Sequence, residues 1–302
     1  MDPIINLFKA DSFSSASLAA AIENRAPVYA DLRVKEIFEA VPVATTSIQI
    51  DQEDTQINLV PQGVRGGGKA VKNKRPSRKA LVIDTPMRRL IDTITAKDIQ
   101  DKRQTGSVDL ETVENVVAKA LSKSAIALDQ TQLYMQLQAL QGKLVDPDGT
   151  TLYDLFSELG ISRTTLDFAL ATGTTEVTDK IIQLQDSVVE GLKGSAFSGI
   201  RVYADTGWFR KFVTHPTVKE VYKGYEAARQ MLGGNASAPF IHNDVEFVKV
   251  SNKFSVVDAY GNVTVKTAIP ANEAFAVPLG TDLAEEYLSP ADHLQFVKSA
   301  RF

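Results

Sequence analysis

With 302 residues, 44% of them hydrophobic and 23% charged, the chain has the composition of an ordinary folded protein, and because it contains no cysteine it can form no disulfide, thiolate metal site or cysteine nucleophile. Its formal charge is −4, but residues 65–79 hold seven of the 33 basic residues and none of the 37 acidic ones, so the rest of the chain carries −11. A basic segment on an acidic body favours contact between copies of the same molecule.

Residues 1–25 are predicted to form an arm with a short helix. Ser14 or Ser15 is a suitable N-cap, and Pro27 stops the helix after Ile22. The start of the chain has no basic stretch followed by a long apolar one, and no apolar run approaches the ~20 residues that cross a bilayer. We therefore expect a protein that is cytoplasmic when it is made.

Residues 43–60 alternate between apolar and polar side chains, which predicts a β-hairpin. Ile48 and Ile50 lie before a polar turn at 52–55, and Ile57 and Leu59 lie after it. A basic segment and a strand-like run that ends at Pro86 follow. This excursion is far longer than the usual connection of ~4–6 residues and cannot build its own core, so we expect a neighbouring subunit to cover its apolar faces.

A long helix is predicted over residues 107–141, with apolar side chains near the 3.6-residue period, Ser107 as its N-cap and Gly142 at its end. Unbroken, it would be ~50 Å long, a spine around which other elements pack. Later segments mix helices and strands and predict an α+β fold: a β-turn at 146–149, a helix at 176–192, a strand at 200–204, helical material at 208–231, a linker at 233–239, and strands at 240–250 and 262–269.

Residues 63–69 have the spacing of a phosphate-binding loop, but the surrounding sequence argues against nucleotide binding. Ala70 stands where a Mg²⁺-binding hydroxyl should follow, and Pro76 and the basic run leave no room for a helix. We expect no hydrolysis of ATP or GTP. Sequence-specific nucleic-acid binding is also disfavoured, because the basic run lacks aromatic residues and the body is acidic.

No pair of carboxylates and no Ser/His/Asp pattern stands out, so the sequence predicts neither an enzyme nor a cofactor. The three histidines, His215, His242 and His293, are far apart and are interpreted as surface or satisfied core residues, not metal ligands. Aromatic residues at helical spacing are interpreted as core rather than as a ligand platform; they are Trp208, Phe209, Phe212, Tyr222 and Tyr225.

Several segments in this order resemble the lambda-like family of phage major capsid proteins. They are FSSASLAAAI, Phe38, VATTSIQID, LVPQGVRGG with Arg65 before the glycines, TAKDIQDKRQTG before the long helix, and DPDGTTLYDLFSELGI after it. The resemblance covers residues 13–160 well and later residues more loosely, through IRVYADTGWFRKFVTHPTVKEVY. Each motif alone is weak, but their order and spacing are specific.

The resemblance implies the α+β capsid fold first seen in the Hong Kong phage. Its parts would be an N-terminal arm and lead-in (1–42), an extended β-hairpin loop with a basic tip (43–92), a peripheral domain with the spine helix (93–198), an axial domain (199–288) and a return toward the peripheral domain (289–302). The family usually continues with a further strand beyond the point where this sequence stops, at Phe302.

The function implied is a non-enzymatic major capsid protein that forms hexamers and pentamers of an icosahedral head around double-stranded DNA. A tail or baseplate protein is the alternative. Expected partners are other copies, scaffold and portal proteins and a decoration protein. The expected location is the virion and, during assembly, the host cytoplasm. No self-catalysed isopeptide bond is expected. The predicted subunit-contact residues of the extended loop are Arg65, Lys69, Lys72, Lys74, Arg75, Arg78 and Lys79.

Overall fold

The computed structural model describes residues 32, 34–53, 78–98, 112–231, 238–251, 253–257, 262–281 and 284–290. Helices and strands alternate irregularly along the chain, so the α+β prediction is confirmed. In order the elements are η3 (Val34–Glu36), β1 (Glu39–Pro42), β2 (Ser47–Glu53), β3 (Arg78–Asp84), η4 (Ala96–Asp98), α3 (Val113–Ala139), β4 (Lys143–Val145), β5 (Thr151–Asp154), α4 (Leu155–Leu159), α5 (Val177–Leu192), β6 (Gly199–Asp205), α6 (Thr206–Thr214), α7 (Pro216–Met231), β7 (Phe240–His242), β8 (Val245–Val250), β9 (Lys253–Val257), β10 (Val263–Thr267), β11 (Ala274–Leu279) and β12 (Glu285–Leu288).

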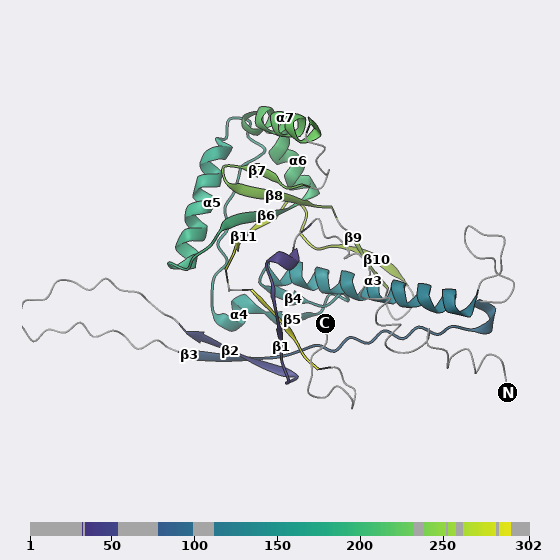
Figure 1. Cartoon of the computed structure of the whole chain (residues 1–302). Helices are drawn as coiled ribbons and strands as arrows, with labels where there is room; N and C mark the ends of the chain where they lie inside the picture. The colour runs from purple at the N-terminus through teal and green to yellow at the C-terminus, as the bar shows by residue number, and fades with distance from the viewer. Residues whose placement is uncertain are drawn as a thin grey trace, which may run out of the picture.

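A four-stranded sheet in the order β11-β6-β8-β7 lies at the centre of the molecule, with hydrophobic cores on both of its faces. Strands β6 and β8 are parallel, and the two outer strands are antiparallel to them. Because successive strand residues point to opposite faces, Val202 and Phe247 meet α5, α6 and α7, whereas Tyr203 and Val248 meet α3. The helices α5 to α7 and the helix α3 therefore lie on opposite sides of the sheet (Figure 1).

The predicted aromatic core is confirmed on the face that carries α6 and α7. Trp208 stacks on Phe212, with ring centroids 5.1 Å apart, and Phe212 lies 4.4 Å from Phe247 of β8. The Tyr222 ring meets Phe240 of β7 edge-on at 5.1 Å. These side chains fill the space between the two helices and the sheet, so they are core residues and not an open platform.

The predicted spine is α3, a helix of 27 residues, or ~40 Å. The Thr112 hydroxyl accepts from the Asn115 N–H at 3.3 Å, so the cap is Thr112 and the prediction of Ser107 was wrong; residues 107–111 lie outside the described part. The predicted end is confirmed: Gly142 has a φ of +83°, and a Cβ there would lie 2.2 Å from the Phe156 ring.

The extended hairpin is built differently from the prediction. Strand β2 continues through Gln52 and Glu53, so a turn at 52–55 was wrong, and its partner is β3, with Ile48 opposite Ile83 and Ile50 opposite Leu81. Residues 57 and 59, the predicted second strand, lie outside the described residues. The β-turn at 146–149 is confirmed: β4 and β5 pair around it, and the Gly149 N–H donates to the Asp146 carbonyl at 2.8 Å.

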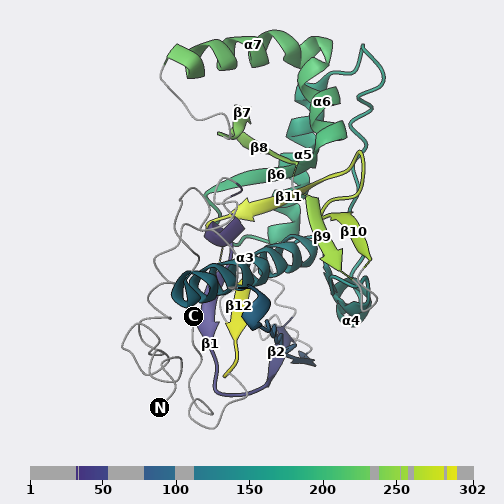
Figure 2. The ribbon, with the colours of Figure 1, turned by 90° about the vertical axis from the view of Figure 1, so that its right-hand side faces the viewer.

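In the second half, the predicted helix 176–192 is confirmed as α5, and the helical stretch 208–231 is confirmed as α6 and α7, separated at His215 where Pro216 begins the next helix. The strands predicted at 200–204, 240–250 and 262–269 are confirmed as β6, the β7–β8 hairpin and β10. Strands β9, β11 and β12 were not predicted. Strand β12 runs parallel to β1 and brings the two ends of the described chain together beneath α3 (Figure 2).

Candidate functional site

Among the described residues, the most deeply buried charge is that of Arg201 in β6, whose side chain is 3% exposed. Its Nε donates to Glu246 of β8 at 2.7 Å and its Nη2 donates to Glu36 of η3 at 3.0 Å. Burial works against the charged guanidinium, but the hydrogen bond to Glu246 and the contributions of Tyr203 and Glu36 raise the Arg201 pKa above its usual value. The cluster fastens the N-terminal lead-in to the central sheet.

The histidines within the described part do not form a catalytic or metal site. The buried His215 ring bridges the Thr217 hydroxyl at 2.8 Å and the Thr172 carbonyl at 3.0 Å, which confirms its interpretation as a satisfied core residue. His242 stacks on Phe240, and desolvation lowers its pKa. His293 lies outside the described residues, among which there is no group of His, Cys, Asp and Glu able to hold a metal ion.

Side chains of the spine and of β5 hold the base of the β2–β3 hairpin. The Asp84 N–H at the end of β3 donates to the Tyr153 hydroxyl at 2.9 Å. Four residues later, Arg88 pairs with Asp146 at 2.7 Å, and its Nη2 also lies 2.8 Å from the Met135 sulfur of α3. The hairpin therefore leaves the body from a fixed base. This contact could not be predicted from the sequence, because the three partners of the Asp84–Arg88 segment are 47 to 69 residues away.

Exposed apolar side chains occur on β3 and in the segment that follows it in the sequence. Four are at least half exposed, from 53% to 73%: Val82, Met87, Leu90 and Ile91. A two-stranded ribbon is marginally stable alone, and an exposed apolar patch is typical of an interaction surface. That a neighbouring subunit covers the hairpin stays a prediction. Residues 87–91 were not predicted as part of that surface.

The structure describes only part of the predicted basic contact residues. Arg78 and Lys79 begin β3, in register with Glu53 and Gln52 of β2. The other five, Arg65, Lys69, Lys72, Lys74 and Arg75, lie outside the described residues.

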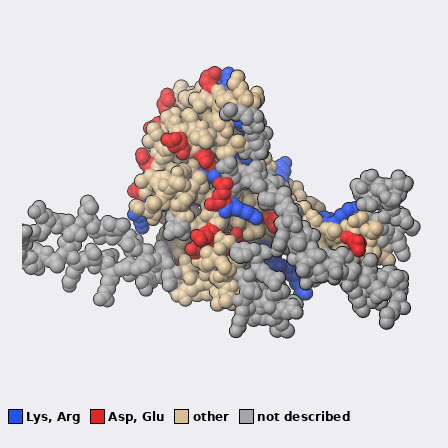
Figure 3. All heavy atoms as spheres, in the orientation of Figure 1, with Lys and Arg blue, Asp and Glu red and all other residues tan. Residues whose placement is uncertain are grey.

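Helix α5 exposes a stripe on the opposite side from its buried Val177 and Ile181. Residues at helical spacing place carboxylates and apolar side chains together on its solvent side; the exposed ones are Asp179, Ile182, Asp186, Val189 and Glu190. Red atoms gather along the side of the molecule where α5 lies (Figure 3). This α5 stripe is suited to a partner that is basic and partly apolar.

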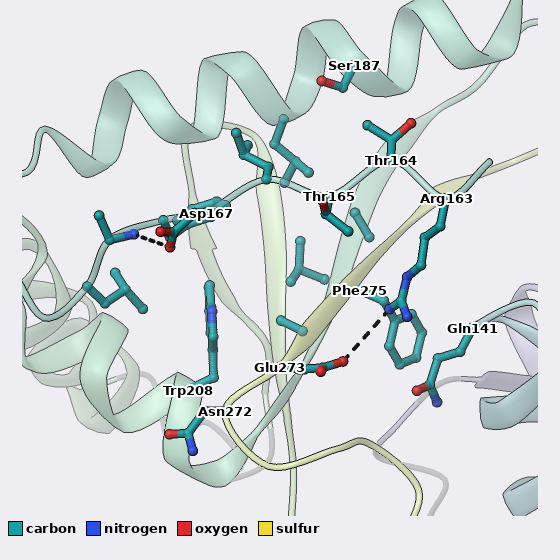
Figure 4. A pocket seen from close by; sticks show the side chains of 18 of the residues that line it. Gln141, Arg163, Thr164, Thr165, Asp167, Ser187, Trp208, Asn272, Glu273 and Phe275 are labelled. Carbon is teal, nitrogen blue, oxygen red and sulfur yellow. Dashed lines mark hydrogen bonds and ion pairs between the residues drawn. The ribbon is translucent and has the colours of Figure 1, made fainter.

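A cavity of about 870 Å³ lies on the inner side of α5, between this helix, the segment 163–172 and strand β11 (Figure 4). Its walls combine apolar side chains, including Leu166, Phe168 and Trp208, with an ion pair between Arg163 and Glu273 at 3.9 Å. No nucleophile with an adjacent base is found among its lining residues. The cavity has the mixed apolar and charged lining of a binding slot.

Comparison with known proteins relates nearly the whole chain to one family. The model of the phage major capsid protein E family matches residues 14–300. A protein named major capsid protein from Salmonella phage Felix O1 (isolate Felix O1-VT1) is 28% identical over 276 residues, covering 85% of this chain and 74% of that protein. One of the same name from Pseudomonas phage KPP10 is 28% identical over 227 residues, covering 69% of this chain and 63% of that protein.

The helices within the described ranges include none that is both long enough and apolar enough to cross a membrane.

Proposed function

Because the chain belongs to the phage major capsid protein E family, we propose that its copies assemble into the icosahedral shell of a phage head, which encloses packaged double-stranded DNA. The observation that carries the proposal is the family match over residues 14–300, and the chain is accordingly a structural component of the virion. Both similar relatives are named major capsid proteins. They favour this function over the tail or baseplate alternative. Hexamers and pentamers are the proposed assembly units.

The proposed layout is that of the Hong Kong phage-type capsid fold of the lambda-like branch. The N-terminal arm would be 1–42, the extended loop 43–92, the peripheral domain 93–198, the axial domain 199–288 and the return segment 289–302. The long α3 and the projecting β2–β3 hairpin support this layout. Helix α5 shares a hydrophobic core with the sheet that contains β6. In this proposal α5 therefore packs as part of the axial domain, although it precedes residue 199.

Assembly explains features that an isolated subunit leaves unsatisfied. The exposed apolar residues from Val82 to Ile91 would be covered by a neighbour, and the basic residues of the loop would meet acidic groups such as the α5 stripe. Each contact is weak, because exposed ion pairs contribute only ~0–1 kcal/mol. Repetition over many copies makes the sum large.

The wider partners belong to the same proposal. Scaffold and portal proteins would take part in assembly in the host cytoplasm, a decoration protein could bind outside, and the DNA would be enclosed without sequence-specific contacts. The shell would expand when DNA is packaged. A non-enzymatic role fits a family of structural proteins.

Negative-stain electron microscopy of the purified, concentrated full chain tests the proposal. We expect closed shells, or tubes of hexamers, and their formation should depend on protein concentration. Particles that remain monomeric at every concentration, with scaffold protein added as well as without it, would contradict shell formation. Stacked rings or fibres in place of closed shells would favour the tail alternative.

A further inference from the structure

The cavity between α5, residues 163–172 and β11 is bordered by two backbones. Its lining includes every residue from 163 to 172 and every residue from 272 to 276. Successive residues of an extended chain point to opposite sides, so an unbroken run of lining residues means that main-chain edges, and not only one row of side chains, border the cavity. In Figure 4 the segment with Thr164 and Thr165 runs beside the strand that carries Phe275. We call this cavity the slot.

One border of the slot is the open edge of the central sheet. Strand β11 is the end strand, and the bond from the Asp205 N–H to the Glu273 carbonyl shows that odd-numbered residues of β11 face β6. The N–H and C=O groups of Ala274 and Ala276 therefore point away from β6, and in the described part no backbone hydrogen bond reaches them. The backbone of Pro278 also points away from β6. Pro278 has no N–H, and an edge strand tolerates proline at such a position because no neighbouring strand needs that donor.

The other border is equally unpaired. Residues 162–168 belong to no helix or strand, and among the described residues no backbone hydrogen bond involves their N–H or C=O groups. Backbone groups seek hydrogen-bond partners. A strand placed in the slot would find donors and acceptors on both sides, and its side chains would meet Leu184 and Val188 of α5 together with Trp208. This is the geometry of recognition by strand addition.

We propose that the slot receives residues 55–60 of a second copy of this chain as an added β-strand. The proposal deepens the shell function and rests on it for the presence of a second copy. The slot's charged lining, Arg163 and Lys211 against Asp167 and Glu273, is neutral overall, and residues 55–64 form a stretch without any charge. Within it, Ile57 and Leu59 alternate with polar residues. This is a strand pattern whose expected partner, β2, is paired with β3 instead.

The basic residues that follow fit the same placement. From Val60 to Arg65 an extended chain can reach ~17 Å, enough to pass around a helix ~10–12 Å in diameter. A strand on the inner side of α5 would thus bring residues 65–79 onto the α5 stripe of carboxylates. The two surfaces of one helix would then recognise two consecutive segments of a neighbour, the neutral one by main-chain bonds and the basic one by charge.

A peptide spanning residues 54–61, titrated by fluorescence anisotropy into the unassembled full chain, tests the slot directly. We expect saturable binding that a scrambled peptide does not reproduce. N-methylation of two central amides, which removes main-chain donors but keeps the side chains, should weaken binding about tenfold or more. No binding, or equal binding of the methylated or scrambled peptide, would overturn the proposal. Because this assay needs no shells, its failure is separate from a failure of the shell function.

Disulfide trapping tests whether the strand comes from a second copy. Because the chain has no native cysteine, the two introduced cysteines are the only ones that can form a disulfide. In assembled L59C/A276C protein, oxidation should produce dimers and larger multimers on a denaturing gel. The matched control is L59C/K219C, because Lys219 is exposed on α7 outside the slot; it should stay monomeric. A monomer that migrates faster because an intramolecular disulfide closes a loop within it would show that the strand does not come from a second copy. Intact shells without any cross-link would overturn the contact itself.

Discussion

Removal of Arg201 should strongly destabilise the subunit, because its side chain is buried and pairs with two carboxylates on different elements. Arg201→Met would leave the carboxylates of Glu246 and Glu36 without their shared cation. We expect the free energy of unfolding of the unassembled chain, measured by urea denaturation, to fall by about 2–4 kcal/mol. Arg201→Lys should recover only part of this, since one ammonium cannot present the same fork to two partners.

Lys223→Met is the matched control for that experiment. Lys223 pairs with Glu220 on the exposed surface of α7, where ion pairs contribute little. Its removal should leave the urea midpoint unchanged within error. Equal midpoints for Arg201→Met and the wild type would show that the Arg201 cluster does not stabilise the fold.

Asp205 links stability to pH. It accepts from the Gly207 N–H at 2.8 Å as the N-cap of α6, and from the Asn272 N–H at 3.0 Å. Partial burial opposes its ionisation, but these backbone donors outweigh burial and lower the pKa of Asp205. Since the folded pKa lies below the unfolded value of ~3.9, the stabilisation is complete above that pH and is lost as pH falls through the folded pKa.

Asp205→Ala should therefore reduce the free energy of unfolding at pH 7 by about 1 kcal/mol, as is usual when an N-cap is lost. The difference from the wild type should shrink as the pH is lowered below ~4, because the wild-type carboxyl becomes protonated there. Thermal unfolding from pH 7 to pH 3 measures both effects. A gap that stays constant over this range would mean that the carboxylate charge plays no part.

Individual residues were predicted well where their role is local. Gly142 and the turn at 146–149 were identified because a helix end and a β-turn depend on neighbours in sequence. The N-cap was misplaced because both Ser107 and Thr112 precede an apolar periodic stretch, and a cap motif alone does not choose between them. The partners of Arg88 and Arg201 were not predictable, since they depend on tertiary contacts between distant segments.

The β2–β3 hairpin is the element whose orientation depends on few side chains. Arg88 holds its base through Asp146 and Met135, and the side chains of the ion pair are only partly exposed. Arg88→Gln should lower the stability of the subunit by no more than about 1 kcal/mol. It should, however, loosen the hairpin, because the bond from the Asp84 N–H to the Tyr153 hydroxyl would then have to hold its base to the body without the Arg88 contacts.

Hydrogen–deuterium exchange measures this loosening. Amides of β2 and β3 should exchange faster in Arg88→Gln, while those of β6 and β8 should not change, and shells should form more slowly. Lys143→Gln, which removes a pair with Asp154 on the neighbouring β4–β5 ribbon, is the control and should leave hairpin exchange as in the wild type. Unchanged exchange in Arg88→Gln would show that the contacts of Arg88 with Asp146 and Met135 do not hold the hairpin.

Among the elements, periodicity predicted the long helices and most strands, but it did not predict which strands pair. β2 and β3 are separated by 24 residues, and the nearer candidate at 57–59 had an equally good alternating pattern. Strand β11 was missed because AFAVPL is apolar throughout and includes a proline, which disfavours a strand except at a sheet edge. That edge position is visible only once the sheet is assembled.

For the whole molecule, the order of the motifs carried the family assignment, which no single motif could do. The match over residues 14–300 confirms a phage major capsid protein family; the lambda-like branch and the domain limits stay predictions. The contact surface was predicted only in part. Charge is visible in sequence, so the basic loop could be identified, but the α5 stripe depends on which helix face the core leaves exposed.

The last prediction concerns the charges through which copies would meet. Seven basic residues within 65–79 repel one another and gain nothing by folding together, so they need acidic partners, which the −11 remainder of an identical copy supplies. Changing Lys72, Lys74 and Arg75 to Glu should leave the thermal midpoint of the unassembled chain nearly unchanged but block shell formation. Added salt should weaken wild-type assembly in the same direction. Normal shells from this variant, or its unfolding, would show that the loop is not an intersubunit arm.

If the α5 stripe is the partner, changing Asp179, Asp186 and Glu190 to Lys in the same chain should restore assembly, because both surfaces then carry exchanged but complementary charge.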